Sequence, residues 1–120
     1  MTEQKKTVNV LSNATKHYKA QIAGDMNNFE VPEWDTTIYY RTITNLKAET
    51  EIVELSRQGK STEALVMSII NKARKDDGSL MFSKHDKDVF MNEVDPKVVL
   101  RVASRLNGDP LPQVSEVAKN

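Results

Sequence analysis

The stretch FEVPEWDTTIYYRTIT, residues 29–44, contains the densest run of β-branched and aromatic residues in this chain. Such residues favour strands, and the stretch predicts two short strands, at residues 29–34 and 37–44, around a turn at residues 35–36. Pro32 cannot donate a ladder hydrogen bond, so the first strand is expected to be an edge strand or to contain a bulge. The sequence therefore predicts a small antiparallel β-hairpin.

Side chains alternate between the two faces of the second predicted strand. Ile38, Tyr40 and Thr42 are expected on one face, and Tyr39, Arg41 and Ile43 on the other. Both faces carry apolar or aromatic residues, so each must be covered by helices of the same chain or by a partner.

Four helices are predicted to follow the hairpin, because apolar residues recur there at helical spacing. Each begins at a residue type that favours the N-cap position. The predicted caps are Thr44, Ser61, Ser83 and Asp95, and the first, second and last helices are predicted to end near Gln58, Lys75 and Asn107. The expected fold is α+β and predominantly helical, with a small antiparallel β-hairpin packed against about four α-helices.

Apolar stripes predict which helical side chains enter the core. The stripe of the first predicted helix is Leu46, Ile52, Val53 and Leu55, and that of the last is Val99, Val102, Ala103 and Leu106. The apolar connector Leu80-Met81-Phe82 is too short for more than a bridge of β-structure.

Three regions follow from these assignments. Residues 1–24 are mostly polar and are interpreted as an N-terminal arm, a mobile segment or weak strand up to Asn13 and a short helix over residues 14–23. Residues 25–108 form the core domain. Residues 109–120 are predicted to be a flexible C-terminal tail.

The composition excludes several classes of function. Seventeen basic and seventeen acidic side chains cancel, which argues against a generic nucleic-acid binder with a basic face. The chain has no cysteine, so disulfides, thiolate nucleophiles and cysteine-based zinc sites are excluded. No apolar run approaches the ~18 residues of a membrane span, and the first residues lack the apolar core of a signal peptide. We expect a cytoplasmic protein that contacts neither membranes nor nucleic acid.

Residues 76–78, Asp-Asp-Gly, resemble part of a calcium loop. An EF-hand requires oxygen ligands at alternate positions before its glycine and a carboxylate six residues after it. Lys75 and Ala73 occupy two of these places and Lys84 a third. A turn that ends the preceding helix is therefore expected instead.

No catalytic, metal or cofactor site is predicted. His85 and Asp86 are adjacent and point to different sides of a helix, and His17, the other histidine, lies in the N-terminal arm. The four glycines are isolated at turns, so no phosphate cradle forms. No spacing indicates a serine nucleophile with its base. We expect a protein without enzymatic activity and without a cofactor.

Aromatic residues of the hairpin are candidates for contact with another protein. Trp and Tyr are favoured anchors in protein interfaces, although packing in the core accounts equally well for some of Trp34, Tyr39 and Tyr40. Methionine adapts to varied partners. The residues predicted to bind a partner are Trp34, Tyr39, Arg41, Met81 and Phe82.

The ordered set of these features resembles the tail assembly chaperone family of long-tailed bacteriophages. The resemblance rests on Val31-Pro32-Glu33-Trp34, on residues 38–44 (IYYRTIT), on residues 77–83 (DGSLMFS) and on Leu106-Asn107-Gly108. It covers roughly residues 25–108. Asp35 and Thr42 depart from the family pattern, in which a small residue often follows the Trp and a Pro often follows the Arg.

The resemblance implies a non-enzymatic factor of the host cell cytoplasm. Such a factor binds the tape measure protein, keeps its long helices soluble, helps to recruit tail tube subunits and is absent from the virion. Recruitment implies a longer product made by programmed frameshift, for which Ala118-Lys119-Asn120 can be encoded by a slippery sequence. Whether copies of the chain form a homo-oligomer along a long client stays open.

Two other functions remain as alternatives. One is a phage tail structural or interaction protein that stays in the particle. The other is a small DNA-binding regulator, since the helix pair at residues 44–58 and 61–75 permits a helix-turn-helix. The second helix of this pair opens with Thr62, Glu63 and Ala64, which do not suit base recognition.

Overall fold

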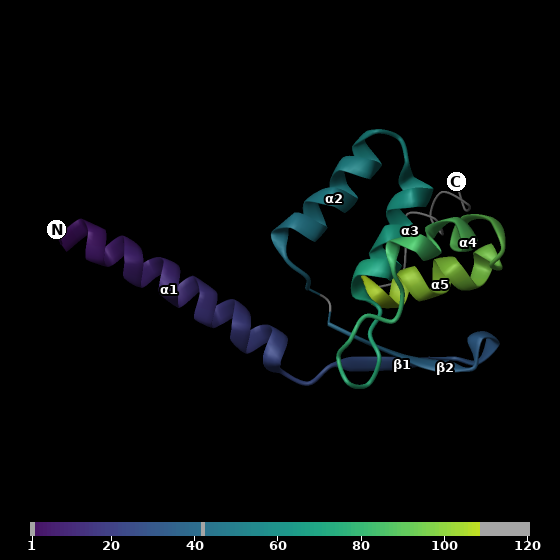
Figure 1. Cartoon of the computed structure of the whole chain (residues 1–120), viewed down its shortest axis with the longest axis horizontal. Helices are drawn as coiled ribbons and strands as arrows, with labels where there is room; N and C mark the ends of the chain where they lie inside the picture. Colours follow the sequence, from purple (N-terminus) through teal and green to yellow (C-terminus); the bar gives the residue numbers. More distant parts are fainter. Residues whose placement is uncertain (1, 42, 109–120) are drawn as a thin grey trace, which may run out of the picture.

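The computed structural model describes residues 2–41 and 43–108, with residues 2–8 described by their backbone alone. In this part of the chain it shows five α-helices and a two-stranded antiparallel hairpin, which confirms the predominantly helical α+β fold (Figure 1). The elements are α1 (Thr2–Ala23), β1 (Asn27–Val31), the 3₁₀ turn η1 (Pro32–Trp34), β2 (Thr36–Tyr40), α2 (Leu46–Arg57), α3 (Ser61–Lys72), the 3₁₀ turn η2 (Lys84–Asp86), α4 (Lys87–Asn92) and α5 (Pro96–Leu106).

The hairpin is shorter than predicted, and its connection is a 3₁₀ turn. The two strands pair Phe29 with Ile38 and Val31 with Thr36. Pro32 lacks an N–H and takes the first position of η1, where none is needed. Asp35 then adopts the left-handed conformation at φ 51° and donates its N–H to the carbonyl of Pro32 at 3.0 Å. This turn directs Trp34 away from the ladder.

A loop after α3 continues the hairpin in the manner of a third and fourth strand. The backbones of Tyr39 and Arg74 exchange two hydrogen bonds, at 2.9 and 2.7 Å, and Arg74 is bridged in turn to Leu80. The predicted bridge in the Leu80–Phe82 connector is therefore confirmed. Gly78, at φ +88°, turns the loop back on itself. Because paired residues share a face, Tyr39, Arg74 and Leu80 lie on one side of this small sheet.

The core forms around α3, which packs against α2, α4 and α5. α3 is apolar on most of its surface, as expected for a helix surrounded by others. Ile38 of the hairpin and Ile69 of α3 are fully buried, and so is Leu106 of α5. The predicted stripe of α5 is confirmed, because Val99, Val102, Ala103 and Leu106 are all buried.

The predicted stripe of α2 is only half correct. Ile52 and Leu55 pack against the core, but Leu46 is 82% exposed and Val53 is 64% exposed. Asn45, and not Thr44, caps the helix, since its side chain accepts the N–H of Ala48 at 2.8 Å. The helix therefore begins one residue later, and Leu46 takes its first position at the solvent-exposed end.

The boundaries of α3 also differ from the prediction. Lys60 precedes the helix, and Ser61 is its first residue and not its cap. The helix ends at Lys72 instead of Lys75, because Ala73 is extended and accepts the N–H of Met81 at 3.1 Å. Pairing with the hairpin thus overrides the helical pattern of these residues. By contrast, the predicted capping box of Ser83 and Asp86 is present, and so is the Asp95 cap with Pro96.

The N-terminal region is one helix, α1, which projects from the rest of the molecule (Figure 1). The weak strand predicted as one alternative before Asn13 is wrong for residues 2–13, which are helical, and the helix predicted over residues 14–23 is confirmed. Val10 and Leu11 are exposed on α1, at 65% and 66%. The predicted C-terminal tail, residues 109–120, lies outside the described residues.

Candidate protein-binding groove

Three aromatic side chains from separate parts of the sequence form one cluster. Trp34 comes from η1, Phe82 from the connector after the loop, and Phe90 from α4. The rings of Phe82 and Phe90 lie 4.8 Å apart at 83°, and those of Trp34 and Phe90 lie 5.9 Å apart. Phe90 is buried, whereas Trp34 and Phe82 are half-buried. Edge-to-face contacts of this kind hold the rings in defined positions while one side of the cluster faces outward.

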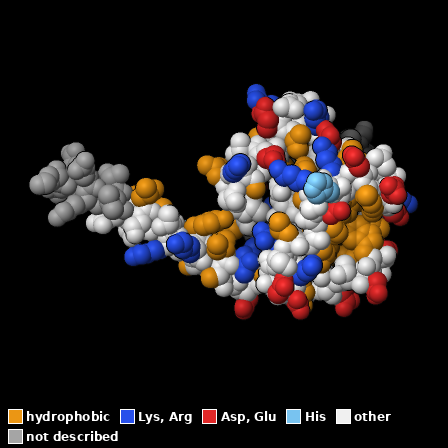
Figure 2. Space-filling model, in the orientation of Figure 1, with side chains coloured by type: hydrophobic (Ala, Val, Ile, Leu, Met, Phe, Trp, Pro, Cys, Tyr) orange, Lys and Arg blue, Asp and Glu red, His pale blue; other side chains and the backbone are white. Residues whose placement is uncertain are grey.

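A groove of about 610 Å³ opens beside this cluster. Its walls are mainly apolar, and two charged side chains, Lys75 and Asp86, stand at its edge. Figure 2 shows an apolar patch, with acidic side chains around it, on the side of the body away from α1. The groove is lined by Trp34, Thr36, Lys75, Met81, Phe82, Asp86, Val89, Phe90 and Val94.

Two ion pairs fasten the walls of the groove to the helices behind them. Arg101 of α5 donates to both carboxylate oxygens of Glu33, next to Trp34, and this hydrogen bonding lowers the pKa of Glu33. Lys87 of α4 lies 2.8 Å from Glu63 of α3, and its hydrogen bond lowers the pKa of Glu63. Both contacts hold the aromatic residues in place from outside the apolar surface.

Local hydrogen bonds set the start of the 3₁₀ turn η2, which leads directly into α4. The side chain of Asp86 accepts the N–H of Ser83 at 2.8 Å, and the hydroxyl of Ser83 accepts the N–H of His85 at 3.3 Å. These contacts satisfy donors that would otherwise be unpaired at the helix end. They also fix the direction in which α4 leaves the connector, and so the position of Phe90 opposite Phe82.

The structure brings together three of the five predicted binding residues. Trp34, Met81 and Phe82 all line the groove. Arg41 and Tyr39 do not: they lie on the opposite face of the small sheet. Tyr39 is half-buried, and its backbone pairs with Arg74. Arg41 donates from Nη2 to the carbonyl of Gly24 at 3.1 Å and so links β2 to the end of α1.

Val89, Phe90 and Val94 line the groove but are not among the residues predicted to bind a partner. Val89, Phe90 and Met91 lie in the helix predicted after Ser83, where α4 has only 6 residues and buries only Phe90. Val89 is 46% exposed and Met91 is 38% exposed. Three consecutive apolar residues cannot all face one side of a helix, and this could have indicated that one of them is presented to a partner.

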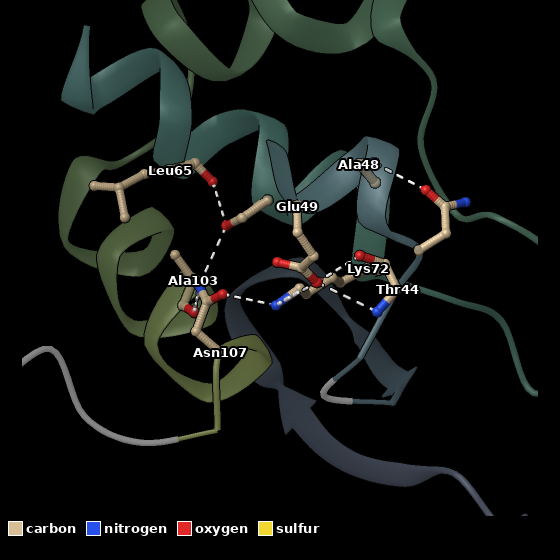
Figure 3. Close-up of polar contacts among 9 residues, drawn as sticks. Thr44, Ala48, Glu49, Leu65, Lys72, Ala103 and Asn107 are labelled. Atoms are coloured by element: carbon tan, nitrogen blue, oxygen red, sulfur yellow. Dashed lines mark hydrogen bonds and ion pairs between the residues drawn. The ribbon is translucent and has the colours of Figure 1, made fainter. Parts of the chain in front are cut away.

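A polar network behind the groove was also not predicted (Figure 3). Lys72 of α3 is buried, and its Nζ donates to Oδ1 of Asn107 at 2.9 Å and lies 3.8 Å from Oε2 of Glu49. Asn107 donates in turn to the carbonyl of Ala103 at 2.7 Å. Buried charge requires partners of this kind, and the network joins α3 to the end of α5 and the start of α2.

The described residues contain no group of three or more His, Asp or Glu side chains that could hold a metal ion. Within the same residues, no helix is long and apolar enough to cross a membrane. Comparisons with protein-family models, with curated proteins and with solved structures find no match to this chain.

Proposed function

We propose that this chain is a tail assembly chaperone of a long-tailed bacteriophage, which binds a helical segment of the tape measure protein in the host cell cytoplasm. The observation that supports the proposal most directly is the groove beside Trp34, where Met81 and Phe82 meet Phe90. An amphipathic helix binds such a groove through apolar residues spaced three or four apart. The proposal also rests on the resemblance of residues 25–108 to that family.

The chemistry of the groove suits a client that is apolar and variable in sequence. Trp34 and Phe82 supply rigid contact area, and Met81 supplies a side chain that adapts to different shapes. Burying apolar surface contributes roughly 25 cal/mol per Å², part of which offsets the entropy lost on association. Binding by this surface is therefore reversible and requires no reacting side chain, in keeping with a non-enzymatic role.

Recruitment of tail tube subunits would depend on a longer product. In this proposal, frameshifting at Ala118-Lys119-Asn120 adds a segment after the tail, so the groove stays available to the tape measure protein. These residues lie outside the described part of the chain. The gene sequence tests this part of the proposal: other codons at this position, with no overlapping downstream frame, would remove it.

The main test is co-expression with the neighbouring tape measure gene. We expect a soluble complex that co-purifies, and we expect the chain to be absent from purified virions. Val89→Glu places a charge in the groove and should abolish co-purification. Val53→Glu, at a similarly exposed valine of α2 away from the groove, serves as the matched control and should leave the complex intact. Retention of the chain in virions, or equal complexes with both variants, would contradict the proposal.

A further inference from the structure

A second pocket, of about 310 Å³, lies on the opposite face of the small sheet from the groove. It is enclosed by the end of α1, the residues that follow β2, the start of α2 and the end of α3. Figure 2 shows Lys and Arg side chains gathered beside the foot of α1. The polar lining includes Arg41, Asn71, Lys72 and Arg74, and the apolar lining includes Tyr18 and Leu80.

Positive charge exceeds negative charge around this pocket. Of its three cationic side chains, Lys72 is the one with an ion pair within 4.0 Å among the described residues, to Glu49. Arg41 and Arg74 each donate to a backbone carbonyl, that of Gly24 and that of Gly78. Among the described residues, neither guanidinium group has a carboxylate within 4.0 Å.

Two buried donors that belong to residues lining the pocket also have no acceptor in the described part of the chain. They are Nε of Arg41 and Nδ2 of Asn71. A buried donor left unpaired costs on the order of 1–3 kcal/mol, and more when it is charged. The amino end of the 12-residue helix α2, marked by Asn45 and Ala48 in the lining, adds partial positive charge. All of these features favour one kind of ligand, an anion with acceptor oxygens.

We propose that this pocket binds a carboxylate of an acidic polypeptide segment. A carboxylate has two acceptor oxygens, and it can pair with one guanidinium group through two parallel N–H···O hydrogen bonds. The apolar walls at Tyr18 and Leu80 suit the carbon atoms that flank such a group. The pocket and the groove share no lining residue. A negative result for carboxylate binding at the pocket would therefore not contradict binding of a helical client at the groove, and the reverse also holds.

The test measures binding of the tripeptide acetyl-Leu-Glu-Leu-amide to the full chain by ¹⁵N NMR. We expect a shift of the Arg41 Nε–H resonance that saturates with peptide. The same peptide with Gln in place of Glu should bind at least tenfold more weakly, because a hydrogen bond to a charged group is replaced. The carboxylate could come from an acidic side chain or from the carboxyl end of a chain. Acetyl-Leu-Gln-Leu with a free carboxyl end tests the second source, and binding equal to that of the Glu peptide would assign the pocket to chain ends.

Two variants separate binding from folding. Arg41→Gln should weaken binding of the Glu peptide at least tenfold, while Arg57→Gln, at an exposed arginine of α2, should not change it. Asn71→Asp places a carboxylate within the pocket, so it should both abolish peptide binding and raise the melting temperature. Asn13→Asp, on the exposed surface of α1, is its control.

Three results would overturn the proposal. One is the absence of any peptide-induced shift at Arg41, as expected if solvent alone satisfies the donors. Another is a lower melting temperature for Asn71→Asp than for the unchanged chain, together with undiminished peptide binding. The third is displacement of the Glu peptide by inorganic phosphate at concentrations where acetate has no effect, which would assign the pocket to phosphate.

Discussion

The two faces of the small sheet differ sharply in chemistry, although they are built from adjacent residues. On one face Ile38 and Tyr40 enter the core, and Met81 continues that face into the apolar groove. On the other face Arg41 and Arg74 line a cationic pocket. Alternation along an extended chain places neighbouring side chains on opposite sides. The loop after α3 therefore contributes Met81 to the apolar groove and Arg74 to the cationic pocket. A protein of this size can therefore present two surface pockets of opposite character.

The largest expected effect is the loss of stability when a side chain is shortened on the core-facing side of the small sheet. Ile38 of β2 is fully buried on the core-facing side of the hairpin, and Ile38→Ala should lower the free energy of unfolding by about 2–5 kcal/mol. Urea denaturation followed by circular dichroism measures the change. Val53→Ala, at an exposed position of α2, should stay within about 0.5 kcal/mol of the unchanged chain. Equal losses for the two variants would mean that the hairpin does not cover the core.

An intermediate loss of stability is expected at Gly78, in the turn of the loop that contributes residues to both faces of the small sheet. Gly78 has φ +88° and open space around the position of a Cβ, so Gly78→Ala is opposed by backbone strain alone. It should cost about 1–2 kcal/mol. Gly24→Ala is the control, since an added Cβ there would meet only carbonyl oxygens, at 3.6 and 3.9 Å, and it should cost clearly less. A neutral Gly78→Ala variant would show that the loop is held by its pairing with Tyr39 and not by its turn.

The smallest effect concerns the ion pairs that fasten the groove. Hydrogen bonds from Arg101 and Lys87 lower the pKa values of Glu33 and Glu63 below their ordinary value of 4.5. A lowered pKa in the folded state means that this stability is fully present above pH 4.5 and is lost as the pH falls through the folded values. Glu33 is exposed and Glu63 is half-buried at the surface, so the contribution is small.

This effect can be measured as the slope of unfolding free energy against pH between pH 5 and pH 2, roughly the range over which such carboxylates take up protons. The double variant Glu33→Gln, Glu63→Gln should have a shallower slope than the unchanged chain. Glu54→Gln, in a surface pair with Arg57 on α2, is the control and should alter the slope less. A slope that is unchanged in the double variant would remove these two residues from the account of acid stability.

Much of the fold follows from local patterns of residue types that can be identified directly in the sequence. The strand around Ile38, the capping box at Ser83 and the Asp95-Pro96 start of α5 were predicted and are present. Trp34, Met81 and Phe82, three of the residues predicted to bind a partner, line the groove. Such signals act within a few residues along the chain, so they can be identified without knowledge of what packs against them.

Other features depend on contacts between distant residues. Lys72 looks like a surface residue in the sequence, yet it is buried because Asn107 and Glu49, from two other helices, lie within reach of its ammonium group. α3 ends before Lys75 because Arg74 pairs with Tyr39 of the hairpin and Ala73 accepts the N–H of Met81. The cationic pocket likewise forms only when α1 and α2 meet the loop after α3.

The sequence by itself determined the class of fold and the faces of β2, since these depend on side-chain type and period. The tertiary structure alone decided that Phe90 joins Trp34 and Phe82, and that Arg41 lies apart from them. The reason is that burial and charge compensation depend on the surroundings of a side chain. Those surroundings are assembled from segments far apart in the chain.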